Sequence, residues 1–125
     1  MLRAADVVVC ATSAPTPVFD SALLRDEVLV VAVGSHEADA RELDAALLPR
    51  ASVVVEDVPT ALREAGDVVL AIADGVLEES SLLDMREVLT GEVEVPRDRP
   101  LVFNSVGMSW QDLVVAEAVV RHTEG

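Results

Sequence analysis

Short runs of consecutive apolar residues, rich in valine, recur along the chain between polar segments. A run without polar alternation is typical of a strand that is covered on both faces, as in a parallel sheet. Four segments have this pattern: residues 6–11, 28–33, 52–56 and 100–104. The pattern therefore predicts a parallel sheet, with its first strand buried on both sides.

Helical patterns follow the first three of these strands, at residues 20–25, 39–48 and 59–65. Asp39 is a suitable N-cap for the second helix, and Gly66 is a suitable stop for the third. Strands and helices that alternate at this spacing are typical of right-handed βαβ units. The apolar segment 66–73 fits either a strand or a buried helical turn, because periodicity cannot separate the two over so few residues.

The C-terminal part of the chain contains two further predicted helices. Residues 80–89 place Leu82, Met85, Val88 and Leu89 on one face, with Gly91 just beyond the end. Residues 92–99 are charged and carry two prolines, so we expect an exposed loop.

Ser109 to Asp112 match a capping box, and the helix that they begin is apolar around most of its circumference. We expect this helix to pack against the sheet. Its apolar breadth also indicates a second partner surface.

Composition narrows the class of protein. A chain of 125 residues with 51% apolar and 26% charged residues is expected to form a single ordered domain. The net charge of −14, with arginine as the only strongly basic residue type, would repel a phosphate backbone, so nucleic acid is not an expected partner. The lack of lysine excludes a Schiff base formed by a lysine of this chain.

Nothing in the sequence indicates a membrane or secreted protein. The apolar runs are far shorter than the roughly 18 residues that cross a bilayer. Residues 1–6 lack the apolar core of a signal peptide, and the single cysteine, Cys10, cannot form an internal disulfide. We therefore expect a cytoplasmic protein without a membrane partner.

Candidate chemistry lies where the predicted strands end, because ligands of open parallel sheets bind outside the carboxyl ends of the strands. Hydroxyl groups follow the first strand at residues 12–17, Gly34 and His36 follow the second, and residues 104–107 follow the fourth. We expect these loops to line one crevice. The alternatives are local turn chemistry for the Ser and Thr residues and simple backbone relief for the glycines.

His36 is the candidate acid or base, since an imidazole titrates near neutral pH. The alternative is a solvated surface histidine. No metal site is expected, because Cys10, His36 and His122 show none of the short spacings of zinc ligands.

The motifs of dinucleotide-binding folds, of hydrolases and of phosphate-loop NTPases are missing from these residues. The first strand runs into Cys-Ala-Thr-Ser-Ala-Pro at residues 10–15 rather than into Gly-x-Gly-x-x-Gly, the phosphate cradle of dinucleotide-binding folds. Neither Gly-x-Ser-x-Gly nor a Walker loop occurs in the sequence.

Three segments together resemble the ornithine cyclodeaminase / mu-crystallin family: ADVVVCATSAPTPVFDSALL, VVAVGSHEADARELDAALLPRASVVVEDVPTALREAGDVVLAI and LVFNSVGMSWQDLVVAEAVV. The resemblance implies an α/β fold, a partial Rossmann-like parallel sheet flanked by helices. It covers only the later part of that family's nucleotide-binding domain. Residues 1–125 are thus expected to be a single partial NAD(P)-binding domain, without the Gly-rich first βαβ unit and the N-terminal substrate domain.

The same resemblance assigns candidate site residues. Cofactor contacts are implied for Ala11, Thr12, Ser13, Val33, Gly34 and Ser105, the first three on the ribose and nicotinamide side. His36 stands where cyclodeaminases carry a catalytic aspartate, which argues against ornithine deamination and for the reductase and dehydrogenase branch. Asn104 occupies a place that lysine often holds in the family.

Two functions are consistent with the sequence. The first is the truncated C-terminal part of an NAD(P)-dependent imino-acid reductase or amino-acid dehydrogenase that acts on a small amino or imino acid. We expect this part to be inactive alone, because the phosphate-binding helix terminus is not encoded. The second is a non-catalytic binding or oligomerisation module of mu-crystallin type, whose open sheet edge acts as an association template. Family members are usually homodimers, so the resemblance also implies a homo-oligomer.

Overall fold

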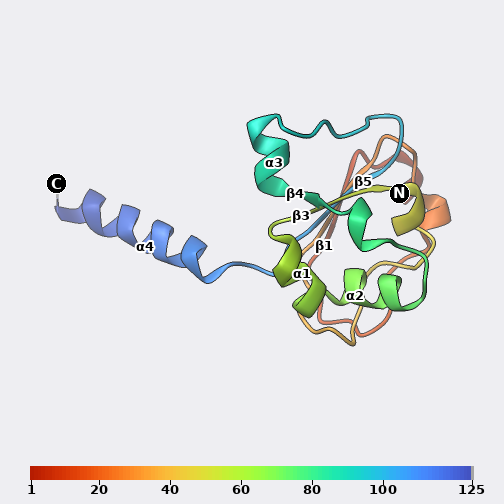
Figure 1. The fold of residues 1–125 in the computed structure, drawn as a ribbon, viewed down its shortest axis with the longest axis horizontal. Helices are drawn as coiled ribbons and strands as arrows, with labels where there is room; N and C mark the ends of the chain where they lie inside the picture. The colour runs from red at the N-terminus through yellow and green to blue at the C-terminus, as the bar shows by residue number, and fades with distance from the viewer. Residues whose placement is uncertain (125) are drawn as a thin grey trace.

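The computed structural model describes residues 1–124 as a twisted parallel sheet with helices around it, and a C-terminal helix that projects outward (Figure 1). The five strands are β1 Val7–Cys10, β2 Leu29–Ala32, β3 Ser52–Val55, β4 Leu83–Asp84 and β5 Leu101–Asn104. Their order across the sheet is β1-β2-β5-β3-β4, and every neighbouring pair is parallel. The predicted α/β parallel sheet is confirmed.

In residues 1–124, four α-helices accompany the sheet: α1 Val58–Glu64, α2 Gly66–Ala73, α3 Met85–Thr90 and α4 Ser109–Glu124. Single 3₁₀ turns stand at Leu2–Ala4, Ser21–Leu23, Leu48–Arg50 and Glu79–Ser81. Within the described part of the chain, no helix is both long enough and apolar enough to span a membrane.

The core lies between one face of the sheet and the segment that carries α1 and α2. It is formed by alternate strand residues and by the apolar sides of these elements, namely Val30, Ala32, Val53, Val55, Val102, Leu43, Leu47, Ala61, Ala65, Val68 and Ala71. Because side chains alternate along a strand, the odd-numbered residues of β1 face the other way. Val7 and Val9 are 54% and 64% exposed, so the prediction that the first strand is buried on both sides is wrong.

Short-range signals mark the start of α1 and the end of α3. Asp57 caps α1 by accepting hydrogen bonds from the backbone N–H and the hydroxyl of Thr60, and these bonds lower the pKa of its carboxyl group. Gly91 ends α3 in the left-handed conformation, with φ of 77°.

The helix predicted at residues 39–48 is absent. The backbone N–H groups of Glu42 and Leu43 donate to Asp67 Oδ1, at 2.9 and 2.8 Å, instead of bonding within a helix. Gly66 does more than end α1, because it is also the first residue of α2. It packs against the loop of residues 39–48, since a Cβ atom on Gly66 would lie 1.8 Å from the carbonyl oxygen of Ala40. The ambiguous segment 66–73 is therefore helical.

The helix predicted at residues 20–25 is reduced to the single 3₁₀ turn Ser21–Leu23. The two predicted helices in the C-terminal part of the chain need correction at their N-terminal ends. In the segment 80–89, the end of a 3₁₀ turn (Glu79–Ser81) and strand β4 (Leu83–Asp84) come first, and α3 begins only at Met85. Helix α4 begins at Ser109, and Gln111 rather than Asp112 bonds back, by accepting from the backbone N–H of Met108 at 3.2 Å.

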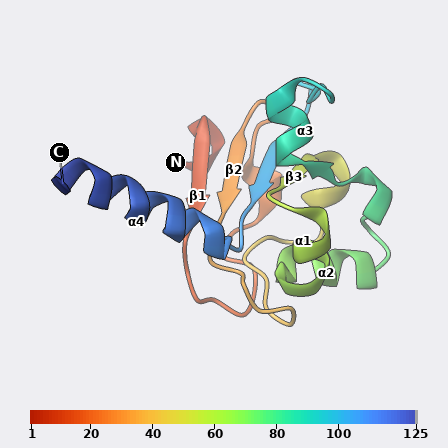
Figure 2. The same cartoon turned by 60° about the vertical axis from the view of Figure 1, so that its left-hand side comes forward.

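Helix α4 does not pack against the sheet. Both views show it extending away from the strands (Figures 1 and 2). Its large apolar side chains are at least half exposed: Trp110, Leu113, Val114, Val115, Val119 and Val120. Figure 2 also shows β1 at the outer margin of the sheet, on the side with no further strand.

Candidate functional site

The strands β1, β2 and β5 end in register at one edge of the sheet. Cys10 pairs with Ala32, and Ala32 pairs with Asn104. The ladder continues one step into the loops, because the N–H of Val33 donates to the Cys10 carbonyl and the N–H of Ser105 donates to the Ala32 carbonyl, each at 2.9 Å. The loops after β1, β2 and β5, in which the sequence predicted the candidate site, therefore leave the sheet side by side.

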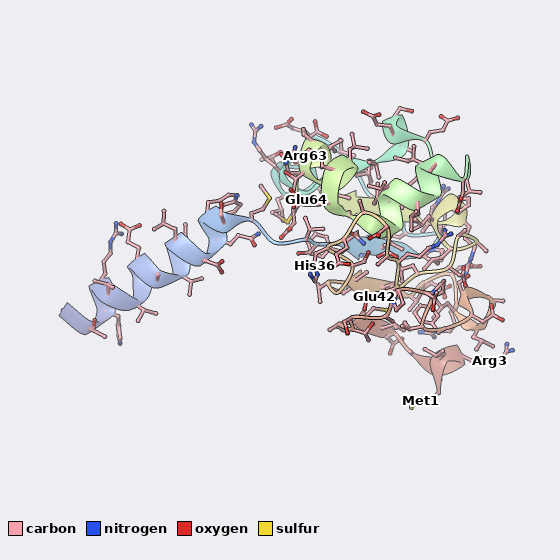
Figure 3. The ribbon with its side chains drawn as sticks, turned by 90° about the horizontal axis from the view of Figure 1, so that it is seen from below. Met1, Arg3, His36, Glu42, Arg63 and Glu64 are labelled. Atoms are coloured by element: carbon pink, nitrogen blue, oxygen red, sulfur yellow. The ribbon has the colours of Figure 1, made fainter. Side chains whose placement is uncertain are left out.

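A buried carboxylate joins the first two of these loops. Glu42 is 0% exposed, and its Oε1 accepts hydrogen bonds from both the N–H and the hydroxyl of Thr12, each at 2.7 Å. Its Oε2 accepts from the N–H of Gly34 at 2.8 Å. Figure 3 shows Glu42 within the body of the domain and His36 nearer its margin. The Glu42 side chain thus holds the loops after β1 and β2 together by hydrogen bonds.

Gly34 is required at this position by close packing. A Cβ atom on Gly34 would lie 2.1 Å from the Thr12 carbonyl oxygen and 2.4 Å from Glu42 Oε1. No side chain fits in that space without moving backbone.

A second buried carboxylate links the third strand end to the same network. Asp67, 2% exposed, accepts from the backbone of Glu42 and Leu43 through Oδ1 and from Asn104 Nδ2 through Oδ2, the last at 3.0 Å. Burial raises the pKa of Asp67 to about 6, with a further contribution from the Glu42 charge, while the three hydrogen bonds oppose the rise.

The two carboxylates also set the state of the neighbouring thiol. Burial, followed by the charges of Glu42 and Asp67, raises the pKa of Cys10 to about 11. The thiol is therefore protonated at neutral pH, which makes it a poor nucleophile and a poor metal ligand. Among the described residues, no three His, Cys, Asp or Glu side chains are grouped so that they could hold a metal ion.

The candidate residues differ in how accessible they are. Ala11, Thr12 and Ser13 are exposed, as is Val33 at 41%, whereas Gly34 and Ser105 are half-buried. His36 is exposed, and its Nδ1 lies 2.9 Å from the carbonyl oxygen of Gly34. Because a carbonyl oxygen only accepts, Nδ1 carries the proton of the neutral ring, which leaves Nε2 as the basic nitrogen.

Glu42 and Asp67 were missed by sequence reasoning. Asp67 does carry a signal, because it is the one charged residue in the apolar segment 66–73. Glu42 carries none, since it lies in a polar stretch where an acidic residue is normally solvated.

The parallel sheet and its polar edge define a Rossmann-like α/β protein. The family model described as ornithine cyclodeaminase/mu-crystallin matches residues 1–125. The chain belongs to this family.

Relatives and solved structures agree with this assignment. The chain is 32% identical over 123 residues to the Delta(1)-pyrroline-2-carboxylate reductase of Colwellia psychrerythraea, a match that covers 96% of this chain and 39% of the relative. It is 35% identical over 115 residues to the ketimine reductase mu-crystallin of Mus musculus, covering 92% and 35%.

Among solved structures, it is similar to the Thermococcus litoralis Delta(1)-pyrroline-2-carboxylate reductase in complex with NADH and L-proline, with a TM-score of 0.87 and 27% identity over 93% of this chain and 37% of that one. The chain thus spans less than two fifths of the length of these proteins.

Proposed function

We propose that residues 1–125 form one partial NAD(P)-binding domain of an imino-acid reductase or amino-acid dehydrogenase, and that the edge at β1, β2 and β5 receives the nicotinamide and ribose of the cofactor. The observation that carries the proposal is the in-register end of these three strands, with Thr12, Gly34 and Ser105 on adjacent loops. The similar Thermococcus litoralis reductase was solved with NADH and L-proline, which supports this ligand class.

The chemistry of the edge suits an uncharged, partly flat ligand group. Exposed Val33 offers an apolar surface, while Ser13 offers a hydroxyl group. The contact of His36 Nδ1 with the Gly34 carbonyl oxygen leaves Nε2 free to take up or return a proton of an amino or imino acid substrate. In this proposal His36 is the acid or base, and Ala11, Thr12, Ser13, Val33, Gly34 and Ser105 contact the cofactor.

The pyrophosphate of the cofactor needs donors that these residues do not provide through a Gly-x-Gly-x-x-Gly loop. We therefore expect residues 1–125 alone to bind NAD(P)H weakly and to show no turnover. Full activity would then require the part of the relatives' length that this chain does not match.

An NMR titration of the chain tests the proposal. Reduced nicotinamide mononucleotide, which lacks the adenine half, is expected to shift the backbone amide signals of Ser13, Gly34 and Ser105, and adenosine monophosphate is not. Ser13→Ala should weaken the effect, whereas Thr16→Val, which changes an exposed hydroxyl outside the proposed contacts, should leave it unchanged. Shifts confined to other loops, or none at millimolar ligand, would refute the assignment.

A second candidate function is a non-catalytic oligomerisation module, and the exposed outer strand favours it. β1 is at the end of the strand order, and Val7 and Val9 are more than half exposed on one of its faces. An unpaired edge beside an apolar face is a template for association with a second chain. A homo-oligomer is proposed under either function.

A further inference from the structure

Glu42 is buried without a compensating cation. Its carboxylate is 0% exposed, and within residues 1–124 no ion pair involves it. Burying a carboxylate costs free energy unless hydrogen bonds replace its hydration. Here the replacement consists of two backbone N–H groups and one hydroxyl, from Thr12 and Gly34.

Converging backbone N–H groups in loops that follow strands form concave anion sites, which proteins use for phosphate and carboxylate ligands. The loops after β1 and β2 form such a set of donors, and the Glu42 carboxylate fills it from inside the protein. The three donors are consequently occupied. The Gly34 carbonyl oxygen is not part of this donor set, because it is an acceptor in contact with His36.

We propose that Glu42 acts as an internal anion: it closes the donor set of Thr12 and Gly34 to external anions, and so determines that this part of the edge accepts only an uncharged ligand group. It is a specificity-determining and positioning residue. The occupied donor set stands on the geometry alone. Only the identity of the uncharged group, the nicotinamide and ribose of NAD(P)H, rests on the proposed function.

Asp67 positions Glu42 through its backbone. Its Oδ1 accepts from the N–H groups of Glu42 and Leu43, which fixes the backbone from which the Glu42 side chain extends. Its other oxygen is bonded to Asn104, so the same contact joins this loop to the end of β5.

Replacing the internal anion with an added one tests the proposal. Glu42→Ala leaves the three donors without an acceptor and should lower the melting temperature by about 5–10 °C. Added formate should restore much of the loss in a saturable manner, because its carboxylate fits where the Glu42 carboxylate lay. The matched control is Leu43→Ala, which truncates the adjacent, equally buried side chain and should not respond to formate.

A gain of anion binding is the second readout, which a merely structural role would not produce. Inorganic phosphate should shift the Thr12 and Gly34 amide signals of Glu42→Ala and leave those of the wild type unmoved. Equal formate responses in the two variants, or saturable phosphate shifts at both amides of the wild type, would overturn the proposal.

If Glu42→Ala does not fold, the phosphate titration of the wild type still tests whether the donor set is closed to anions. The isosteric Glu42→Gln is then the second variant, because its side-chain amide can offer only one acceptor oxygen to the three donors. Failure of the proposed function is distinguishable. If reduced nicotinamide mononucleotide produces no shifts while formate rescues Glu42→Ala, the donor set is correct and the cofactor assignment is wrong.

Discussion

The side-chain amide of Asn104 donates a hydrogen bond of 3.0 Å to Asp67 Oδ2, and so ties the end of β5 to the first turn of α2. Both side chains are almost completely buried. The other amide atom, Asn104 Oδ1, has no partner among the described residues. Because a rotated amide would present Oδ1 to Asp67, the pair can also accommodate a protonated carboxyl group, which would then donate to Asn104.

The pH dependence of stability should reveal this carboxyl group. Burial raises the pKa of Asp67 to about 6, so between about pH 4 and pH 6 the folded protein holds a proton that the unfolded chain has released. The contribution of Asp67 to the free energy of unfolding should therefore fall by about 3 kcal/mol as the pH rises through this window, and stay constant above it.

Denaturant unfolding of the wild type and of Asp67→Asn from pH 4 to pH 7 measures this contribution as the difference between the two slopes, because all other carboxyl groups are common to both proteins. Asp74→Asn, which changes an exposed carboxylate, is the control and should follow the wild type. A difference that rises with pH would contradict the assignment.

The Cys10 thiol should be slow to react in the folded protein. Its pKa is raised to about 11 and the side chain is 3% exposed, so both the thiolate fraction and the access are low. Iodoacetamide at pH 8 should alkylate it at least about 100-fold more slowly in buffer than in urea. In a Val9→Cys, Cys10→Ala variant the thiol moves to the exposed face of the same strand and should react at nearly the unfolded rate.

Gly34 should tolerate substitution poorly. A Cβ atom would overlap the Thr12 carbonyl oxygen and the Glu42 carboxylate, so Gly34→Ala should lower the free energy of unfolding by about 3 kcal/mol or more. Gly75→Ala is the matched control: no atom lies within 4 Å of its Cβ position, and its φ of +73° alone should cost only about 1–2 kcal/mol. Urea unfolding compares the two, and equal losses would show that packing at Gly34 is looser than described.

The sheet was predictable because its signal is local. Short apolar runs, most of them rich in valine, mark β1, β2, β3 and β5 within a residue or two of their observed ends, and parallel pairing then brings their carboxyl ends to one edge. For that reason the neighbouring positions of Thr12, Gly34 and Ser105 could be inferred without coordinates.

The rest depends on contacts between distant residues. The segment 39–48 has a helical pattern, yet two of its N–H groups bond to Asp67, which lies 24 and 25 residues away, and the loop packs on Gly66. Glu42 looks like a surface residue until the loops of β1 and β2 are placed around it. The direction of α4 is likewise not encoded in its own apolar pattern, which only indicates that something should cover it.

The exposed face of β1 should drive association of the chain with itself. Val7 and Val9 are 54% and 64% exposed on the outermost strand, where an unpaired edge and an apolar face coincide. Sedimentation velocity should therefore show a sedimentation coefficient that rises with protein concentration, and more steeply in high salt, which screens the net charge of −14. Val9→Lys should abolish the rise, because it places a charge in the middle of this face.

Val18→Lys, at a 41% exposed valine outside the sheet, introduces the same charge and should leave association unchanged. A wild type that sediments as a monomer at every concentration would instead mean that the outer face of β1 alone does not support a homo-oligomer.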